Sequence, residues 1–107
     1  MALGHEAVAD QDFAAALGDR AKATAAGATA LGSETEATAT WATAVGEGAL
    51  ASGVESVALG VESSATAADS VAIGSASAVS HAGSIALGAN AVDNDATLGT
   101  AAVVPPA

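Results

Sequence analysis

The chain has 107 residues, enough for one domain, and it contains no cysteine, so neither a disulfide framework nor a thiolate metal site is expected. Its 12 acidic and 2 basic side chains give a formal net charge of −10. This balance argues against nucleic acid and against an anionic membrane surface as partners, because both need a cluster of Lys and Arg. No apolar run approaches the length of a membrane span, so we expect no membrane contact by this segment.

A glycine recurs every fourteen residues along most of the chain, without an insertion. The residue before each of these glycines is a large aliphatic one, and the residue before that is always alanine. The seven glycines are Gly4, Gly18, Gly32, Gly46, Gly60, Gly74 and Gly88. Self-similarity at a fixed period indicates a repeat architecture.

The clearest copy of the repeat is Ser70-Val71-Ala72-Ile73-Gly74. Its alternation places Val71 and Ile73 on one side and Ala72 on the other, which is typical of a strand. Alanine-rich sequence favours helix, but the regular glycines and the many Ser and Thr residues argue against it. A second alternation of small residues, such as Ala49-Leu50-Ala51, follows each glycine. Each coil is therefore predicted to hold two parallel-stacked strands of about five residues and two tight turns, and seven coils would form an all-β solenoid of roughly 34 Å.

The regularity of the repeat changes along the chain. The first coils are degenerate copies of the repeat, and the motif is well kept from Ser56 onwards. The fourteen-residue spacing is lost after Gly88. A further unit, Ala96-Thr97-Leu98-Gly99, follows eleven residues later. We therefore predict a roll over 1–99 with a shortened last coil and a C-terminal tail over 100–107, whose prolines cannot donate to another ladder. Met1 stands where later copies carry valine, so we expect a segment of a longer repeat array.

The stretch Ala49 to Gly60 resembles, position for position, the head repeat of trimeric autotransporter adhesins, the YadA-like head domain. The resemblance extends from Ala2 to about Leu87. It implies a left-handed parallel β-roll, a homotrimer, and a non-catalytic role in virulence through adhesion to an extracellular matrix protein or a host surface glycan. It also implies display at the cell surface, after export, in a full-length protein anchored in the outer membrane. Export and anchoring rest on the resemblance alone.

The alanine column suggests a limit on side-chain size, which a closely packed neighbouring subunit would impose. We therefore predict that large aliphatic residues fill each roll and that the alanines face the partner subunits. An alternative is that alanine fits the interior of a thin roll. The residues assigned to the repeat and its interface are Val57, Ala58, Leu59, Gly60, Val71, Ala72, Ile73, Gly74, Ala86 and Gly88.

Phe13 and Trp41 occupy the same position of the period, two coils apart, with Gly27 between them. One interpretation is an exposed platform for a glycan or an apolar ligand. The other is that both rings cap a corner or fill a groove between subunits, because aromatic side chains usually bury area.

No catalytic constellation is found, so we predict a non-enzyme with no catalytic residues, no cofactor and no metal site. Asp93-Asn94-Asp95 resembles the start of a calcium loop, but it lacks the glycine and the closing glutamate that such a loop needs. His5 and His81 have no partner at a ligand-like spacing and are expected at the surface.

Two functions compete at this point. The first is an adhesive head segment, and the second is a structural spacer or the receptor-binding part of a phage or surface fibre, which would place the chain in a virion fibre. Ice binding is disfavoured, because it needs a regular ladder of threonines from coil to coil. Only one coil, at Thr38-Ala39-Thr40, carries threonine in both of the relevant columns.

Overall fold

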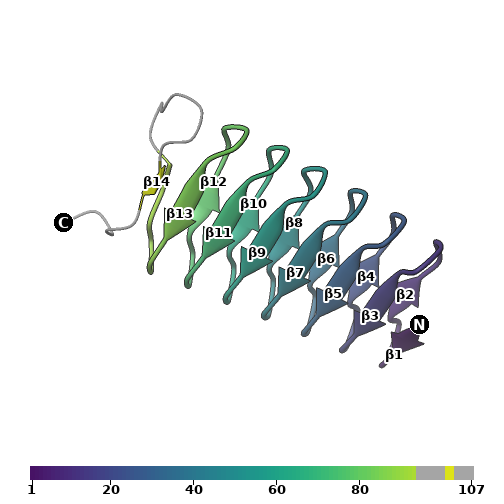
Figure 1. Ribbon diagram of the computed structural model, residues 1–107. Coiled ribbons are helices and arrows are strands. Elements are labelled where there is room, and N and C mark those ends of the chain that lie inside the picture. Colours follow the sequence, from purple (N-terminus) through teal and green to yellow (C-terminus); the bar gives the residue numbers. More distant parts are fainter. Residues whose placement is uncertain (94–100, 103–107) are drawn as a thin grey trace.

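A computed structural model describes residues 1–93 and the backbone of residues 101–102 (Figure 1). The described chain consists of short strands joined by tight turns. They are β1 (Ala2–Leu3), β2 (Val8–Ala9), β3 (Ala15–Leu17), β4 (Lys22–Ala23), β5 (Thr29–Leu31), β6 (Glu36–Ala37), β7 (Thr43–Val45), β8 (Leu50–Ala51), β9 (Val57–Leu59), β10 (Ser64–Ala65), β11 (Val71–Ile73), β12 (Ala78–Val79), β13 (Ile85–Leu87) and β14 (Ala101–Ala102). These strands are shorter than the predicted five residues, because the turns take a larger share of each coil.

The strands form two parallel sheets that wind into one solenoid. The odd-numbered strands and β14 make an eight-stranded sheet, and the even-numbered strands from β2 to β12 make a six-stranded sheet. Val71 pairs with Val57 on one side and with Ile85 on the other, so each coil advances the register by fourteen residues. The molecule measures 38 × 23 × 12 Å. The predicted all-β solenoid with fourteen residues per coil is confirmed.

The recurring glycines form one corner of the roll, where the chain leaves the eight-stranded sheet. Gly74 has a φ of +127°, and the other glycines of this column lie between +122° and +134°. A Cβ atom on Gly74 would lie 2.6 Å from the carbonyl carbon and oxygen of Gly88 in the next coil. Only glycine fits here, because it tolerates this φ and leaves room for the neighbouring backbone.

The interior contradicts one prediction from the sequence. Ala58, Ala72 and Ala86 are completely buried within the single chain, whereas Val71 and Ile73 lie on the outer side of the same strand. The alanines therefore do not face partner subunits, and the large aliphatic residues do not fill the roll. The size limit is real, but the opposite strand of the same coil imposes it. Inward-pointing side chains of both sheets share the interior of a molecule only 12 Å thick, and the residues buried there are small.

The rest of the interior is also made of small residues. Serine and threonine join the alanines there, and several of their hydroxyl groups donate to turn carbonyls: Ser63 to Gly60 at 2.9 Å, Ser77 to Gly74 at 2.9 Å, and Ser70 to Ala67 at 2.6 Å. Among the described residues, the buried hydroxyl groups of Ser56 and Ser84 have no hydrogen-bond partner. Hydroxyl groups are thus tolerated in a thin core because the corners supply carbonyl acceptors.

The fourteen-residue spacing ends after β13. Ile85 pairs with Ala101 and Ala86 pairs with Ala102, an advance of sixteen residues. The predicted boundary between roll and tail at residue 99 is therefore wrong, because residues 101–102 belong to the eight-stranded sheet. The predicted unit Ala96–Gly99 lies outside the described residues.

Candidate interaction surface

The outward side of the eight-stranded sheet carries the large aliphatic side chains. We call this surface the aliphatic face. It is formed by two columns of residues, Ala15, Thr29, Thr43, Val57, Val71 and Ile85 in one, and Leu3, Leu17, Leu31, Val45, Leu59, Ile73 and Leu87 in the other. No residue in either column is charged.

Stacking along the coils buries each side chain of this face only in part. Leu59 and Ile73 are half-buried between their neighbours in the column, whereas Leu3, at one end of the sheet, is 63% exposed and Leu87 is 42% exposed. The outer surface of these side chains meets no other part of the described chain. A continuous apolar surface of this kind marks an interaction site in a soluble protein.

The outward side of the six-stranded sheet differs in composition. We call it the mixed face, and its column of outward residues is Val8, Lys22, Glu36, Leu50, Ser64 and Ala78. Charged, polar and apolar residues follow one another, so no continuous apolar stripe forms. Only one of the two outer surfaces of the roll is therefore suited to a large apolar contact.

Phe13 and Trp41 lie at the corner that leads into the eight-stranded sheet, and they are the only aromatic residues of the chain. Phe13 is 84% exposed and Trp41 is 57% exposed, with φ values of +63° and +59°. A Cβ atom on Gly27 would overlap the indole ring of Trp41, so this ring lies over the glycine between the two aromatic positions. A left-handed conformation costs a bulky residue about 1–2 kcal/mol, so the fold holds both aromatic residues outward at a cost.

The opposite corner carries most of the ion pairs. The Nδ1 atom of His5 lies 3.0 Å from Asp19 Oδ1, and Arg20 lies 3.5 Å from Asp19 and 3.6 Å from Glu34. The contacts of His5 with Asp19 and of Arg20 with Glu34 link successive coils, whereas Arg20 and Asp19 are neighbours in one coil. All three are exposed, so each adds little to stability. His5 lies at the surface, as expected, and Asp19 follows it by one full period, a spacing that places the two residues side by side in successive coils.

The same corner holds a shallow acidic hollow around Gly48. Its walls are Glu34, Glu36, Glu47 and Glu62. Within the described part of the chain, no group of three or more His, Asp and Glu residues has the arrangement of a metal site.

A second histidine contact lies at the C-terminal end of the roll. His81 Nδ1 is 2.6 Å from Asp93 Oδ2, and the carboxylate of Asp93 is almost completely buried. The sequence predicted His81 at the surface with no partner at a ligand-like spacing, and it argued against a calcium loop at Asp93-Asn94-Asp95, because the required glycine and closing glutamate are missing. The repeat pattern could not predict this contact, because His81 and Asp93 are twelve residues apart whereas the period is fourteen. Asn94 and Asp95 lie outside the described residues.

The described chain is thus a repeat-built β-solenoid of fourteen-residue coils in two parallel sheets, with one uncharged aliphatic outer face. The family model of the YadA head domain repeat matches residues 1–21, 14–35, 37–63, 51–77 and 65–91, and these matches together cover most of the chain. The chain belongs to the YadA head domain family, a family of non-enzymatic adhesins, and it forms an adhesin-like head segment. Membership in this family points to a location at the cell surface.

Among curated proteins no match to the chain was found. None of the residues that the structure describes forms a helix of the length and apolarity needed to cross a membrane.

Proposed function

We propose that the chain is a segment of a trimeric surface adhesin head, in which the aliphatic face packs against two further copies and the corners contact the host ligand. The observation that carries this proposal is the absence of charge from the aliphatic face in a chain of net charge −10. Heads of this family assemble as trimers, which supports the choice of a second copy as the occupant of this face.

The physical argument for assembly concerns the small core. The interior consists almost entirely of alanine and serine, whose burial contributes little, while the residues with the largest apolar area lie outside. Covering the aliphatic face would remove that area from water at about 25 cal/mol per Å². Assembly thus supplies the hydrophobic stabilisation that a thin roll without disulfides or metals lacks.

Mass measurement with a matched pair of variants tests the assembly. Leu59→Asp places a charge on the aliphatic face, and Leu50→Asp places the same charge on the mixed face from the neighbouring strand β8; both leucines are half-buried. In analytical ultracentrifugation at micromolar concentration, we expect a trimer for the wild-type chain and for Leu50→Asp, and a monomer or an unfolded chain for Leu59→Asp. A wild-type monomer, or equal dissociation of both variants, would contradict the proposal.

The ligand-contacting part of the proposal places Phe13 and Trp41 at the binding surface, for an extracellular matrix protein or a surface glycan. Their exposure supports this role, since both offer large rigid apolar surfaces at a strained corner. We expect the double variant Phe13→Ser, Trp41→Ser to lose most binding in a solid-phase assay against matrix proteins and glycans. Val54→Ser, which removes an apolar residue exposed by 49%, is the control and should bind normally.

A structural spacer in a surface or phage fibre is the competing function. It predicts a trimer of unchanged mass that binds none of the matrix proteins and glycans at micromolar concentration. If the double aromatic variant still forms a trimer and still binds, adhesion remains the function, but the ligand site lies at another corner of the roll.

A further inference from the structure

The carboxylate of Asp93 occupies an unusual position at the C-terminal end of the six-stranded sheet. In the fourteen-residue period, Asp93 follows Ala65 and Val79 in a column whose side chains point into the roll. Every earlier member of this column is alanine or valine, whereas Asp93 is acidic and only 5% exposed. A buried carboxylate is costly unless hydrogen bonds satisfy it, so its surroundings call for an explanation.

The earlier coils show what this position normally does. The backbone N–H of Thr38 donates to the carbonyl of Ala51, that of Ser52 to Ala65, and that of Thr66 to Val79, each at 3.0–3.1 Å. The acceptor is thus always the main-chain carbonyl of the residue thirteen positions later. By the same rule, the N–H of Ser80 would donate to the carbonyl of Asp93.

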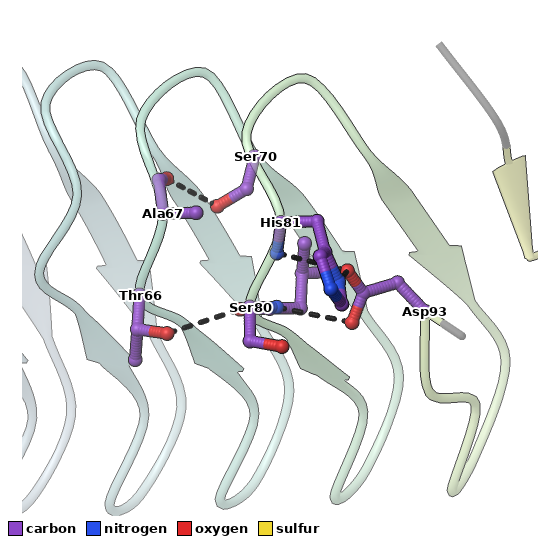
Figure 2. Close-up of polar contacts among 7 residues, drawn as sticks. Thr66, Ala67, Ser70, Ser80, His81 and Asp93 are labelled. Carbon is purple, nitrogen blue, oxygen red and sulfur yellow. Dashed lines mark hydrogen bonds and ion pairs between the residues drawn. The ribbon is translucent and has the colours of Figure 1, made fainter. Parts of the chain in front are cut away.

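At Ser80 the acceptor is instead the side chain of Asp93. The N–H of Ser80 donates to Oδ1 at 3.0 Å, and the N–H of His81 donates to Oδ2 at 2.9 Å (Figure 2). The same view shows Thr66 one coil earlier, whose hydroxyl group donates to the carbonyl of Val79 in the next coil at 3.2 Å. One carboxylate therefore takes the last ladder bond and also a turn amide.

His81 holds the carboxylate from the other side. Its Nδ1 atom lies 2.6 Å from Oδ2, so three nitrogen atoms surround the two oxygens. Figure 2 shows the imidazole ring of His81 lying against the carboxylate group. Bonds to a charged acceptor are about twice as strong as neutral ones, which offsets the burial of the charge.

The register of the ladder differs before and after Asp93. Val92 still forms a bridge with Ala78, and the N–H of Asp93 donates to the carbonyl of Ala78 at 3.1 Å. The next described strand, β14, then pairs with β13 at an advance of sixteen residues. The fourteen-residue spacing therefore still holds at Val92, next to the residue whose side chain acts as acceptor, and no longer holds at Ala101.

We propose that Asp93 is a cap that ends the six-stranded sheet: its carboxylate takes over the ladder bond of the next coil, and this releases the chain from the fourteen-residue period. His81 is a positioning residue that fixes the orientation of the carboxylate. The arrangement resembles the capping of a helix N-terminus, where a side-chain oxygen satisfies backbone N–H groups at the end of a regular element. It supplies acceptors for the backbone amides of Ser80 and His81 at the end of the six-stranded sheet.

Amide hydrogen exchange of the full-length chain, followed residue by residue by NMR, tests the cap. In Asp93→Ala we expect exchange at Ser80 and His81 to become about tenfold faster or more, because a charged acceptor is lost. Asp93→Asn retains one carbonyl acceptor for two amides, so one of the two should stay protected. Asp69→Asn removes an equal charge from an exposed corner and should change neither amide.

A second readout distinguishes a cap from a general loss of structure. The amide of Val71 in β11 should keep its wild-type protection in Asp93→Ala, because it donates to the main-chain carbonyl of Ser84 and not to the carboxylate of Asp93. His81→Ala should weaken protection at Ser80 while His81→Gln, which retains a donor, restores much of it. Unchanged exchange at Ser80 and His81 in Asp93→Ala would overturn the proposal, and so would an equal loss of protection at β11.

Discussion

The two outer faces of the roll are built on the same interior but have opposite chemistry. Behind both sheets lies the same layer of alanine and serine, because the opposite wall of each coil limits side-chain size. The aliphatic face repeats valine, leucine and isoleucine in coil after coil, while the mixed face passes from Lys22 to Glu36 to Leu50. The fold therefore dictates the interior, and the proposed contact with further copies of the chain would explain why only one outer face stays apolar.

The corner that holds the two faces in place should be the most sensitive part of the molecule. Gly74→Ala forces a Cβ atom to within 2.6 Å of the Gly88 carbonyl group at a φ of +127°. We expect the free energy of unfolding to fall by about 3 kcal/mol or more, measured by chemical denaturation.

Gly48→Ala is the matched control for this corner. Its φ is +69°, and an added Cβ would meet only Glu62 Cγ, at 3.5 Å. The expected loss is about 1–2 kcal/mol, from the left-handed conformation alone. Equal losses at Gly74 and Gly48 would show that close approach between coils is not the limiting factor.

The contrast between interior and exterior is tested by enlarging an alanine on each side. Ala72→Leu overfills the roll, and we expect a loss of about 3 kcal/mol, at the upper end of overpacking effects, or failure to fold. Ala78→Leu, on the outward side of β12, should change stability by less than about 0.5 kcal/mol. A folded Ala72→Leu chain that merely dissociates would restore the rejected prediction that the alanines face partner subunits.

The contrast between the two outer faces is sharpened by making each more apolar. Thr43→Val extends the aliphatic face, and Ser64→Val adds the same kind of side chain to the mixed face. Burial of an added methyl group is worth about 0.8 kcal/mol, so Thr43→Val should tighten self-association several-fold per contact. Sedimentation over a range of concentrations would show this, and an equal gain from Ser64→Val would contradict the assignment of the interface.

The smallest expected effect is local and depends on pH. Burial raises the pKa of Asp93, but the hydrogen bonds from Ser80 and His81, and the charge of His81, outweigh it and leave the pKa below its ordinary value of 3.8. A carboxyl whose pKa is lower in the folded state stabilises that state above its unfolded pKa, and this contribution is lost as the pH falls through the folded pKa.

The cap should therefore be intact at neutral and mildly acidic pH and should open only below pH 3.8. The amide proton shifts of Ser80 and His81 should titrate together in that range. His81 is the titratable side chain that contacts Asp93 within the described ranges. A midpoint above pH 3.8 would show that burial dominates over the hydrogen bonds.

The repeat period, the two strands per coil and the turn glycines could all be predicted from the sequence, because each depends on local spacing. The direction of the faces could not. Alternation separates Ala72 from Val71 and Ile73, but hydrophobicity then favours the larger residues for the core. The deciding quantity is the thickness of the coil, which depends on how two strands of one coil approach each other. Small residues in both strands, together with Ser63 and Ser77 in the same columns as alanine, were the available signal.

The contacts at the end of the roll could not be predicted from the sequence, for a different reason. Periodicity predicts contacts between residues fourteen apart, such as His5 and Asp19, but His81 and Asp93 meet at twelve. The sixteen-residue advance from Ile85 to Ala101 likewise departs from the period. Such contacts depend on where the chain leaves the repeat, and a repeat pattern carries no information about that point.

Site-specific cross-linking tests the central claim, that the aliphatic face is the surface between subunits. The chain has no native cysteine, so Ile73→Cys and Ala78→Cys place single thiols on the aliphatic and mixed faces. With a short bifunctional maleimide, we predict efficient covalent linkage between chains for Ile73→Cys and little for Ala78→Cys. Preferential linkage through Ala78→Cys, or none through Ile73→Cys in a chain shown to be folded, would contradict the account.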